Sequence, residues 1–339
     1  MSEVVSILVE TGRKIDPVME RYLSRHAAPE FLEAILYQVK AGGKRIRPAL
    51  TMVSAGAAGG RIEDSYPAAA AVEIIHNYSL ILDDIIDHSE KRRGKPTVWK
   101  KYGLSTAILV AVHYRESAVE ALNDTPDPVA FHELLAWTDK ELLDGERLDV
   151  LMEQAGREDE PYVMENRLAK MGIEDYLKMV EKKTARLIET SCRFGGMSVG
   201  APRRIVEALA RYGYNVGIAF QVGDDIIDLF GVEERTGKRV GQDIKEHKLG
   251  NVVTLLALEE LEGSERGEEL RRIITTPQIS WGDVKRALEI IAETGAKKRA
   301  EEIRDRYVEE ALQALNELGE NEYTRLLREL AVFIKEREY

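Results

Sequence analysis

The sequence predicts an all-α fold. Long stretches rich in Ala, Leu, Glu, Lys and Arg favour helix, and only ten prolines and 6% aromatic residues interrupt them among the 339 residues. Runs of Val, Thr and Tyr that alternate with the period of a strand are scarce. Apolar residues make up 44% of the chain, enough to bury a substantial core. No break is long or polar enough for an interdomain linker, so we expect residues 1–339 to form one domain.

Turn signals separate the expected helices in chain order. The clearest breaks are Gly42-Gly43, Gly59-Gly60, Gly94-Lys95-Pro96 and residues 126–128 and 231–241. The helices between these breaks are expected at residues 2–25, 29–41, 45–58, 65–88, 103–122, 128–154, 173–198, 202–230 and 249–262, with two or three more after residue 281.

The charge and composition of the chain exclude some partners. A formal net charge of -12 and a pI near 5.2 argue against a general nucleic-acid binder, which needs a basic face. Cys192 is the only cysteine, so neither an intrachain disulfide nor a thiolate zinc cluster can form, as suits a reducing cytoplasm. The N-terminus lacks the features of a secretion signal, and no run of about 18 apolar residues predicts a membrane span. We therefore expect a cytoplasmic protein that neither binds nucleic acid nor spans a membrane.

Two copies of Asp-Asp-Ile-Ile-Asp, at residues 83–87 and 224–228, are the most informative motif. Each copy closes a long apolar helical segment. On a helix, the first and last aspartates of each copy project from the same face, and the second is turned about 100° away. Like charges at that spacing destabilise a helix, and carboxylates among buried apolar side chains need a cation to offset them.

Hard carboxylate oxygens suit magnesium, which takes one or two carboxylates and completes its octahedron with water and substrate phosphate. Two such clusters facing each other would hold several ions around a diphosphate. The alternative is that each cluster is a solvated helix end paired with nearby Lys or Arg. The presence of two copies on apolar helices favours the metal site.

Basic residues accompany the first cluster. Residues 42–48, Gly-Gly-Lys-Arg-Ile-Arg-Pro, join a glycine turn to three cations at the start of an expected helix, where backbone amides and arginine forks favour phosphate oxygens. Arg92-Arg93 follows the cluster closely. The alternatives are a solvated loop at 42–48 and, at 92–93, local balancing of the charges of Asp87 and Glu90.

Further candidates lie before and after the second cluster. Gln221 precedes it by less than one turn, Lys238 and Lys248 follow it, and Lys183-Thr184 lies within an earlier helix. His76 precedes the first cluster on the same helix. Each of these alone is more often an ordinary surface or core residue.

In order and spacing, this set of motifs resembles the trans-isoprenyl diphosphate synthases (polyprenyl synthetases) over about residues 40–255. The resemblance is closest to the archaeal short-chain geranylgeranyl type. It implies a helical bundle around a deep central cavity, a homodimer, and acidic motifs that face each other across the cavity mouth. It also implies that isopentenyl diphosphate is condensed with dimethylallyl, geranyl or farnesyl diphosphate, with geranylgeranyl diphosphate as the expected product. The implied cofactor is Mg²⁺, as three ions with substrate bound, with Mn²⁺ as a substitute.

The resemblance also implies a role for each motif residue. The magnesium ligands would be Asp83, Asp87 and Asp224, supported by Asp84, Asp225 and Asp228. Isopentenyl diphosphate would be bound by Lys44, Arg47, His76 and Arg93. The allylic diphosphate would be bound by Arg92, Lys183, Lys238 and Lys248. Oxygens near the developing carbocation would come from Thr184 and Gln221, which with Lys183 form the expected catalytic set.

The expected product length depends on Tyr78, five residues before Asp83, where the family places the residue that stops chain growth. A bulky ring there, without a two-residue insertion in the first motif, is similar to the archaeal geranylgeranyl type. Ordinary core packing is the alternative. Departures from the family pattern leave the reaction class intact but weaken the length prediction; they fall at Leu82, Val112, Glu146 and residues 249–251.

Three other function classes compete with this one. A class I terpene cyclase shares the first acidic motif, but its second metal site has an Asn/Ser/Glu pattern that is absent from residues 224–228. A non-catalytic partner subunit of a heteromeric synthase usually lacks one acidic motif, and both are complete here. A purely structural helical protein needs no buried carboxylates with phosphate-binding cations. Farnesyl, geranylfarnesyl and hexaprenyl diphosphates stay open as products.

Overall fold

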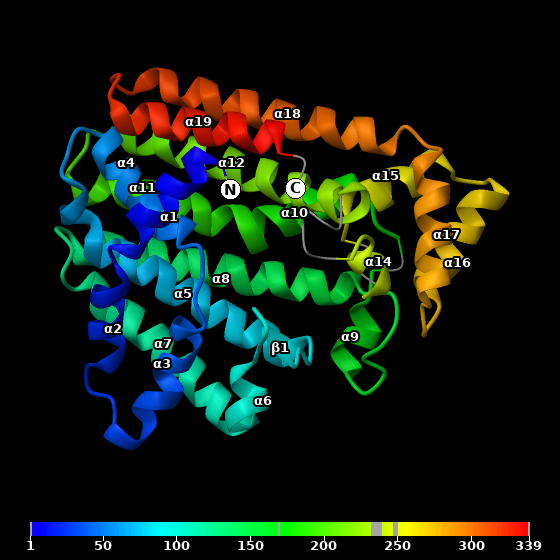
Figure 1. The fold of residues 1–339 in the computed structure, drawn as a ribbon, viewed down its shortest axis with the longest axis horizontal. Helices are drawn as coiled ribbons and strands as arrows, with labels where there is room; N and C mark the ends of the chain where they lie inside the picture. The colour runs from blue at the N-terminus through cyan, green and yellow to red at the C-terminus, as the bar shows by residue number, and fades with distance from the viewer. Residues whose placement is uncertain (1, 169, 232–238, 247–249, 338–339) are drawn as a thin grey trace. The chain divides into compact units, whose positions relative to one another are not determined.

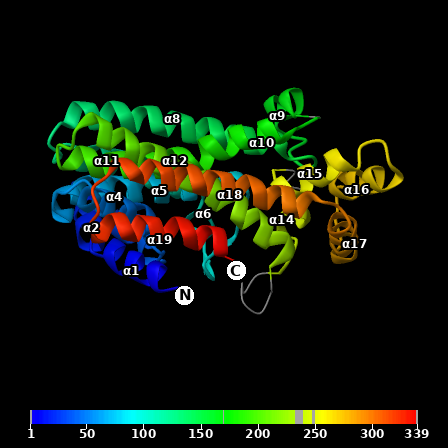
Figure 2. The ribbon, with the colours of Figure 1, turned by 90° about the horizontal axis from the view of Figure 1, so that it is seen from above.

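Helix α5 (Tyr66–Ile86) shows how the sequence builds the core. Residues 68–72, four alanines and a valine, are fully buried, because small side chains on every face of a helix let its neighbours approach closely. The helices that pack against α5 include α4 (Ile46–Ala57), α7 (Leu104–Leu122) and α11 (Arg186–Ser198). Figure 2 shows α4 and α11 beside α5, and Figure 1 shows α7 beside it.

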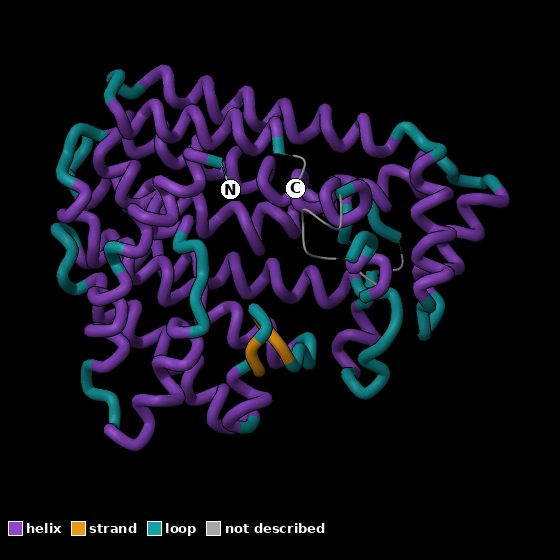
Figure 3. The backbone as a smooth tube through the Cα atoms, viewed as in Figure 1, coloured by secondary structure: helices purple, strands orange, loops and turns teal. Residues whose placement is uncertain are grey.

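The computed structural model describes residues 2–168, 170–231, 239–246 and 250–337. Within them the secondary structure is almost entirely helical, and the only strands, β1 (Lys91–Arg92) and β2 (Lys95–Pro96), form one antiparallel hairpin (Figure 3). The predicted all-α fold is therefore confirmed. No helix in the described part of the chain is long and apolar enough to cross a membrane.

The chain divides into two compact units, and neither is a continuous segment. The first unit comprises Met1–Leu142, Arg186–Tyr214 and Leu312–Leu330. The second unit comprises Leu143–Ala185, Asn215–Ala311 and Ala331–Tyr339. Four helices contribute residues to both units: α8 (Pro128–Met152), α12 (Arg203–Phe230), α18 (Ala296–Ala314) and α19 (Glu322–Glu336).

The first unit begins with a correction to the sequence prediction. The helix expected at 2–25 is two helices, α1 (Glu3–Arg13) and α2 (Asp16–Ser24), because Pro17 has no N–H to donate to the carbonyl of Arg13. The remaining elements of this unit are η1 (Pro29–Phe31), α3 (Leu32–Lys40), η2 (Ile62–Ser65), α6 (Val98–Tyr102) and η4 (Leu315–Glu317).

In the second unit, α15 packs against α10, α16 and α17. The elements of this unit are α9 (Pro161–Asn166), α10 (Ile173–Val180), the π-helical segment η3 (Glu181–Ala185), α14 (Gln242–Lys245), α15 (Val252–Glu260), α16 (Glu265–Thr275) and α17 (Trp281–Ala292). The expected helix at 173–198 thus contains a π-helical segment. The sequence did not predict α6, α9 and α14, which are too short for a periodic signal, or α16, whose apolar positions are few.

Candidate active site

The first acidic cluster closes α5 and contains both exposed and buried carboxylates. Asp83 and Asp87 are partly exposed, whereas the side chain of Asp84 is 1% exposed. Arg92 binds both kinds: its Nη2 donates to Asp83 Oδ2 and its Nε donates to Asp84 Oδ1, each at 2.8 Å. The expected division of faces therefore holds for this cluster.

The β1–β2 hairpin positions Arg92. Its two turn residues, Arg93 and Gly94, have φ values of 53° and 76°, the positive values that a two-residue type I′ turn requires. This conformation is easy for Gly94 but strained for Arg93. The tight turn of this hairpin, a few residues after α5, therefore holds Arg92 and Arg93 close to the end of that helix.

The buried Asp84 carboxylate holds Arg92 in place by accepting its Nε–H. Burial raises the pKa of the Asp84 carboxyl to about 6, and the Arg92 guanidinium opposes that rise. Asp84 Oδ2 is buried without a hydrogen-bond partner. The role of Asp84 as a supporting metal ligand stays a prediction.

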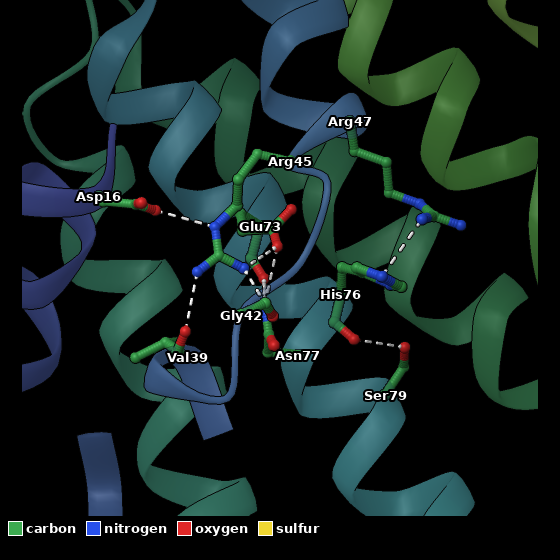
Figure 4. A network of polar contacts seen from close by, with 9 residues as sticks. All are labelled: Asp16, Val39, Gly42, Arg45, Arg47, Glu73, His76, Asn77 and Ser79. Carbon is green, nitrogen blue, oxygen red and sulfur yellow. Dashed lines mark hydrogen bonds and ion pairs between the residues drawn. The ribbon is translucent and has the colours of Figure 1, made fainter. Parts of the chain in front are cut away.

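Basic side chains gather around His76, earlier on α5. We call Arg47, His76 and Arg93 the basic cradle. Arg47 Nη1 donates to His76 Nε2 at 3.2 Å (Figure 4), while Arg47 Nε is buried and has no hydrogen-bond partner. Arg93 lies against the glycine turn, because a Cβ at Gly43 would come within 3.1 Å of Arg93 Nη1. Lys44, in the same turn, is exposed.

The electrostatics of the cradle favour an anion. Burial and the positive charge of Arg47 and Arg93 hold the pKa of His76 well below its usual range. Since a guanidinium only donates hydrogen bonds, His76 Nε2 accepts from Arg47, and the neutral ring carries its proton on Nδ1. Burial also lowers the pKa of Arg47. A guanidinium whose buried Nε has no partner is costly unless an anion binds it, so the cradle suits a phosphate oxygen.

The cradle and the first acidic cluster share one face of α5. Positions 76, 83 and 87 are seven and four residues apart, so their side chains point the same way. With a rise of about 1.5 Å per residue, His76 lies about 10 Å from Asp83 along the helix axis. One helix face therefore carries a residue of the basic cradle and the outward-facing carboxylates of the first acidic cluster in succession.

The second acidic cluster lies on α12, in the second unit. The side chain of Asp224 is 38% exposed and accepts a hydrogen bond from Arg337 Nη1 at 2.6 Å. Arg337 also lies over the ring of Phe220, 5.3 Å from its centroid. Asp228 Oδ2 accepts the backbone N–H of Asp243 at 3.1 Å. The cation that balances Asp224 thus comes from the segment after α19.

Asp225 is the buried member of this cluster. Its Oδ1 accepts from Gln221 Nε2 at 3.0 Å, and its Oδ2 accepts the backbone N–H of Val252 at 2.9 Å. Burial and the nearby carboxyl of Asp243 hold the pKa of Asp225 well above its usual range. As in the first cluster, the second aspartate turns inward, but here its partners are neutral donors.

The π-helical segment η3 carries Lys183 and Thr184. Neighbouring helices press closely against it at two glycines: a Cβ at Gly145 would lie 2.4 Å from the backbone nitrogen of Lys183, and one at Gly217 would lie 2.6 Å from Ala185 Cα. Larger residues at these glycines would displace the segment. Single π-helical turns of this kind are frequent at functional sites.

Both side chains of this segment have defined partners. Lys183 Nζ contacts Asp149 Oδ2 at 2.6 Å and Glu146 Oε2 at 2.8 Å. Thr184 Oγ1 donates to Gln221 Oε1 at 3.2 Å. Glu146, a departure from the family pattern, therefore supplies a second carboxylate to Lys183.

Tyr78 packs half-buried against the core of the first unit, where burial, with a smaller effect of the Asp139 carboxyl, raises the pKa of its phenol. Its role in stopping chain growth stays a prediction. Lys238 and Lys248, two of the expected ligands of the allylic diphosphate, lie outside the described residues.

Two contributors to the site were missed by reasoning from the sequence. Glu73 is the only charged residue between positions 66 and 82, and a lone carboxylate in such an apolar helix is a detectable signal. Arg337 lies 113 residues from Asp224, and nothing in the sequence around it indicates the pairing.

The carboxylates of both clusters fit magnesium. Each cluster offers partly exposed oxygens, the hard ligands that this ion prefers. Among the residues that the structure describes, no three His, Cys, Asp or Glu side chains come together as a closed metal site.

Comparisons with known proteins agree with this chemistry. The family model of polyprenyl synthetase matches residues 28–291. Heptaprenyl diphosphate synthase component 2 from Geobacillus stearothermophilus is 33% identical over 100% of this chain and 99% of its own length. Among solved structures, geranylgeranyl pyrophosphate synthetase from Pyrococcus horikoshii has a TM-score of 0.88 and 31% identity over 99% of each chain. A polyprenyl synthase from Caulobacter crescentus, in complex with calcium and isoprenyl diphosphate, has a TM-score of 0.85 and 29% identity over 99% of this chain and 98% of that one.

Proposed function

Since the chain belongs to the polyprenyl synthetase family and is a prenyltransferase, we propose that it condenses isopentenyl diphosphate with an allylic diphosphate, in the presence of Mg²⁺, to form geranylgeranyl diphosphate. One observation carries this proposal. The buried Arg47 Nε lacks a partner within a basic cradle, and that cradle shares a helix face with the carboxylates of Asp83 and Asp87. An anion site about 10 Å from a metal site suits a reaction that joins two diphosphates.

The basic cradle, together with Lys44, binds the diphosphate of isopentenyl diphosphate in this proposal. Arg47 offers its unused Nε–H, and the neutral His76 offers the proton on Nδ1. Arg93 and the exposed Lys44 add positive charge from the hairpin and the glycine turn. Together they would fix the acceptor substrate while its double bond attacks.

The allylic diphosphate is bound through the acidic clusters and the cations Arg92 and Lys183. Magnesium held by Asp83, Asp87 and Asp224 would neutralise the charge that builds on the leaving diphosphate, and we expect three ions. In this proposal Arg92, which donates to Asp83 and Asp84, also donates to a phosphate oxygen beside the first cluster.

Oxygens of Thr184 and Gln221 stabilise the allylic carbocation in this proposal. Thr184 Oγ1 donates its proton to Gln221 Oε1, so the lone pairs of the hydroxyl stay available to positive charge. Gln221 is held in turn by Asp225 through its Nε2 donor. These contacts keep both oxygens oriented before substrate binds.

Sizing the products tests the proposal. Purified protein is incubated with Mg²⁺, labelled isopentenyl diphosphate and, in turn, dimethylallyl, geranyl or farnesyl diphosphate. We expect geranylgeranyl diphosphate from each primer, and no product in the presence of a chelator. A shorter or longer product would refute the length assignment alone. If no primer gives a product, the chain is a partner subunit, as the name of the Geobacillus stearothermophilus relative allows.

We also propose that the protein is a homodimer. Three apolar residues one turn apart, Leu104, Ile108 and Val112, lie exposed along one side of α7, and Val129 and Trp137 are exposed on α8. A second copy of the chain that buries this side would remove it from water. Sedimentation should give a dimer for the wild type and a monomer for Ile108→Lys with Val112→Glu; a wild-type monomer would contradict the proposal.

A further inference from the structure

Arg45, between Lys44 and Arg47 of the basic motif, is held from several sides at once (Figure 4). Its Nε donates to Asp16 Oδ1 at 2.8 Å, and its Nη1 donates to Glu73 Oε1 at 3.0 Å. Its Nη2 donates to the carbonyl oxygen of Val39 at 2.9 Å. The residue is 5% exposed, so these partners, and not water, satisfy the guanidinium.

The backbone directs the Arg45 side chain inward. Arg45 precedes α4 with a φ of 54°, in the left-handed region that favours glycine. A Cβ at Gly43 would lie 2.8 Å from Arg45 Nη1, so only glycine leaves room for the guanidinium beneath the turn. Such a conformation persists only where the surroundings enforce it, and the hydrogen-bond partners of Arg45 do so.

Arg47 differs from Arg45 in what it still lacks. Its Nη1 donates to His76, but its buried Nε has no partner. The carboxylate that interacts electrostatically with both Arg45 and Arg47 is that of Glu73, which lies one turn before His76 on α5. Whichever arginine binds Glu73 directly loses its capacity for an external anion.

We propose that Arg45 is a positioning residue that binds Glu73 and thereby keeps Arg47 available for the diphosphate of the acceptor substrate. Glu73 is 2% exposed, and its Oε1 is occupied by Arg45 Nη1 and by Asn77 Nδ2 at 3.1 Å. The buried carboxylate offsets one guanidinium, and the second stays uncompensated until an anion arrives. This inference rests on the proposed function, because it takes the cradle to be the isopentenyl diphosphate site.

A direct role of Arg45 in substrate binding does not fit its contacts. All three of its nitrogens already donate to groups of the protein, and its side chain is buried beneath the glycine turn. Its effect on the substrate must therefore pass through Glu73 and Arg47.

The test compares Arg45→Met with the double variant Arg45→Met/Glu73→Gln. Binding of isopentenyl diphosphate is measured by calorimetry, and KM for each substrate is measured separately. In Arg45→Met the released Glu73 binds Arg47, so affinity and KM for isopentenyl diphosphate should weaken about tenfold, while KM for the allylic substrate stays within about twofold. In the double variant no carboxylate competes for Arg47, and affinity should return to within about threefold of the wild type.

Two controls separate positioning from folding. Arg47→Met should lose binding and should not be rescued by Glu73→Gln, since the donor itself is gone. Arg45→Lys keeps a cation beside Glu73 and serves if Arg45→Met unfolds; it should weaken binding less, and Glu73→Gln should again restore it.

Some results would overturn the inference while leaving the function intact. These are wild-type binding in Arg45→Met, or folded single and double variants, by thermal unfolding, that bind equally weakly. The second result would mean that Arg45 only shapes the turn. If the folded wild type itself binds no isopentenyl diphosphate, the proposed function fails instead.

Discussion

The two acidic clusters have the same five residues but different surroundings. In the first, the cation Arg92 lies nine residues after Asp83 and binds both an exposed and a buried aspartate. In the second, Arg337 lies 113 residues from Asp224 and donates to that partly exposed aspartate. The buried Asp225 is instead held by neutral amide groups. An identical motif therefore combines with a counter-ion from a nearby residue in one unit and with a counter-ion from a distant segment in the other.

This difference between Arg92 and Arg337 lets the contribution of a counter-ion to stability be separated from its effect on metal binding. Arg92 both balances a buried charge and approaches the expected metal ligands, so its loss affects stability and chemistry together. Arg337 pairs with Asp224, an expected metal ligand whose side chain is 38% exposed, so its loss should affect metal binding more than stability.

Removal of an outward-facing carboxylate from either cluster should abolish condensation. Asp83→Ala and Asp224→Ala should each lower kcat by about 100-fold to 1,000-fold or more, because each takes away a ligand that stabilises the leaving group. Both should unfold within a few degrees of the wild type, since these side chains are partly exposed. Asp64→Ala, an exposed aspartate in the first unit, is the control and should keep full activity. Normal turnover in either variant would end the metal-site interpretation.

Arg92→Met should destabilise the protein, whereas Arg337→Met should not. The first change leaves Asp84 buried without its cation and should cost about 2–3 kcal/mol in the free energy of unfolding. The second breaks a more exposed ion pair and should cost less than about 1 kcal/mol. Denaturant unfolding without metal measures both, and equal losses would show that the two counter-ions are equivalent.

Arg337→Met should strengthen magnesium binding. The guanidinium occupies an oxygen of Asp224, and an exposed ion pair of up to about 1 kcal/mol corresponds to a change of about fivefold in affinity. Calorimetry with Mg²⁺ measures the change directly. Lys335→Met is the matched control, because Lys335 is paired with Asp305 and should leave the affinity unaltered. An unchanged affinity in Arg337→Met would show that the ion displaces this arginine at no cost.

The smallest effect on rate is expected from substitution of Tyr78. This tyrosine lies five residues before Asp83, whereas the corresponding position before Asp224 is Ala219. Tyr78→Ala should lengthen the product by one or more five-carbon units, because the space that opens admits a longer chain. Chromatography of the products checks this. Tyr66→Ala, on the same helix, should leave the length unaltered, and an unchanged length in Tyr78→Ala would assign the stop to another residue.

The sequence was sufficient for the fold class and for the pairing of faces within each cluster. Both follow from helical periodicity and composition, which are local. It was not sufficient for the break before Pro17 or for the short helices α9 and α14, where too few residues carry a pattern. That residues 1–339 form one domain stays a prediction.

The sequence was sufficient to name many residues of the candidate site, but not to predict which of them contact one another. Arg47, His76 and the outward-facing aspartates could be named from their motifs, and the structure brings Arg47 and His76 together. The role of Arg45 in binding Glu73 could not be named, because it depends on a left-handed backbone and on packing between α4 and α5. The pairing of Arg337 with Asp224 joins distant segments, and no local pattern predicts such a contact.

The most direct test of the central claim, that both clusters hold magnesium, is to count bound ions. Mg²⁺ is titrated by calorimetry into wild type, Asp83→Ala and Asp224→Ala, each saturated with a non-ionisable allylic diphosphate analogue. We expect three ions in the wild type and fewer in each variant. A wild-type count that survives either substitution unchanged would contradict the claim.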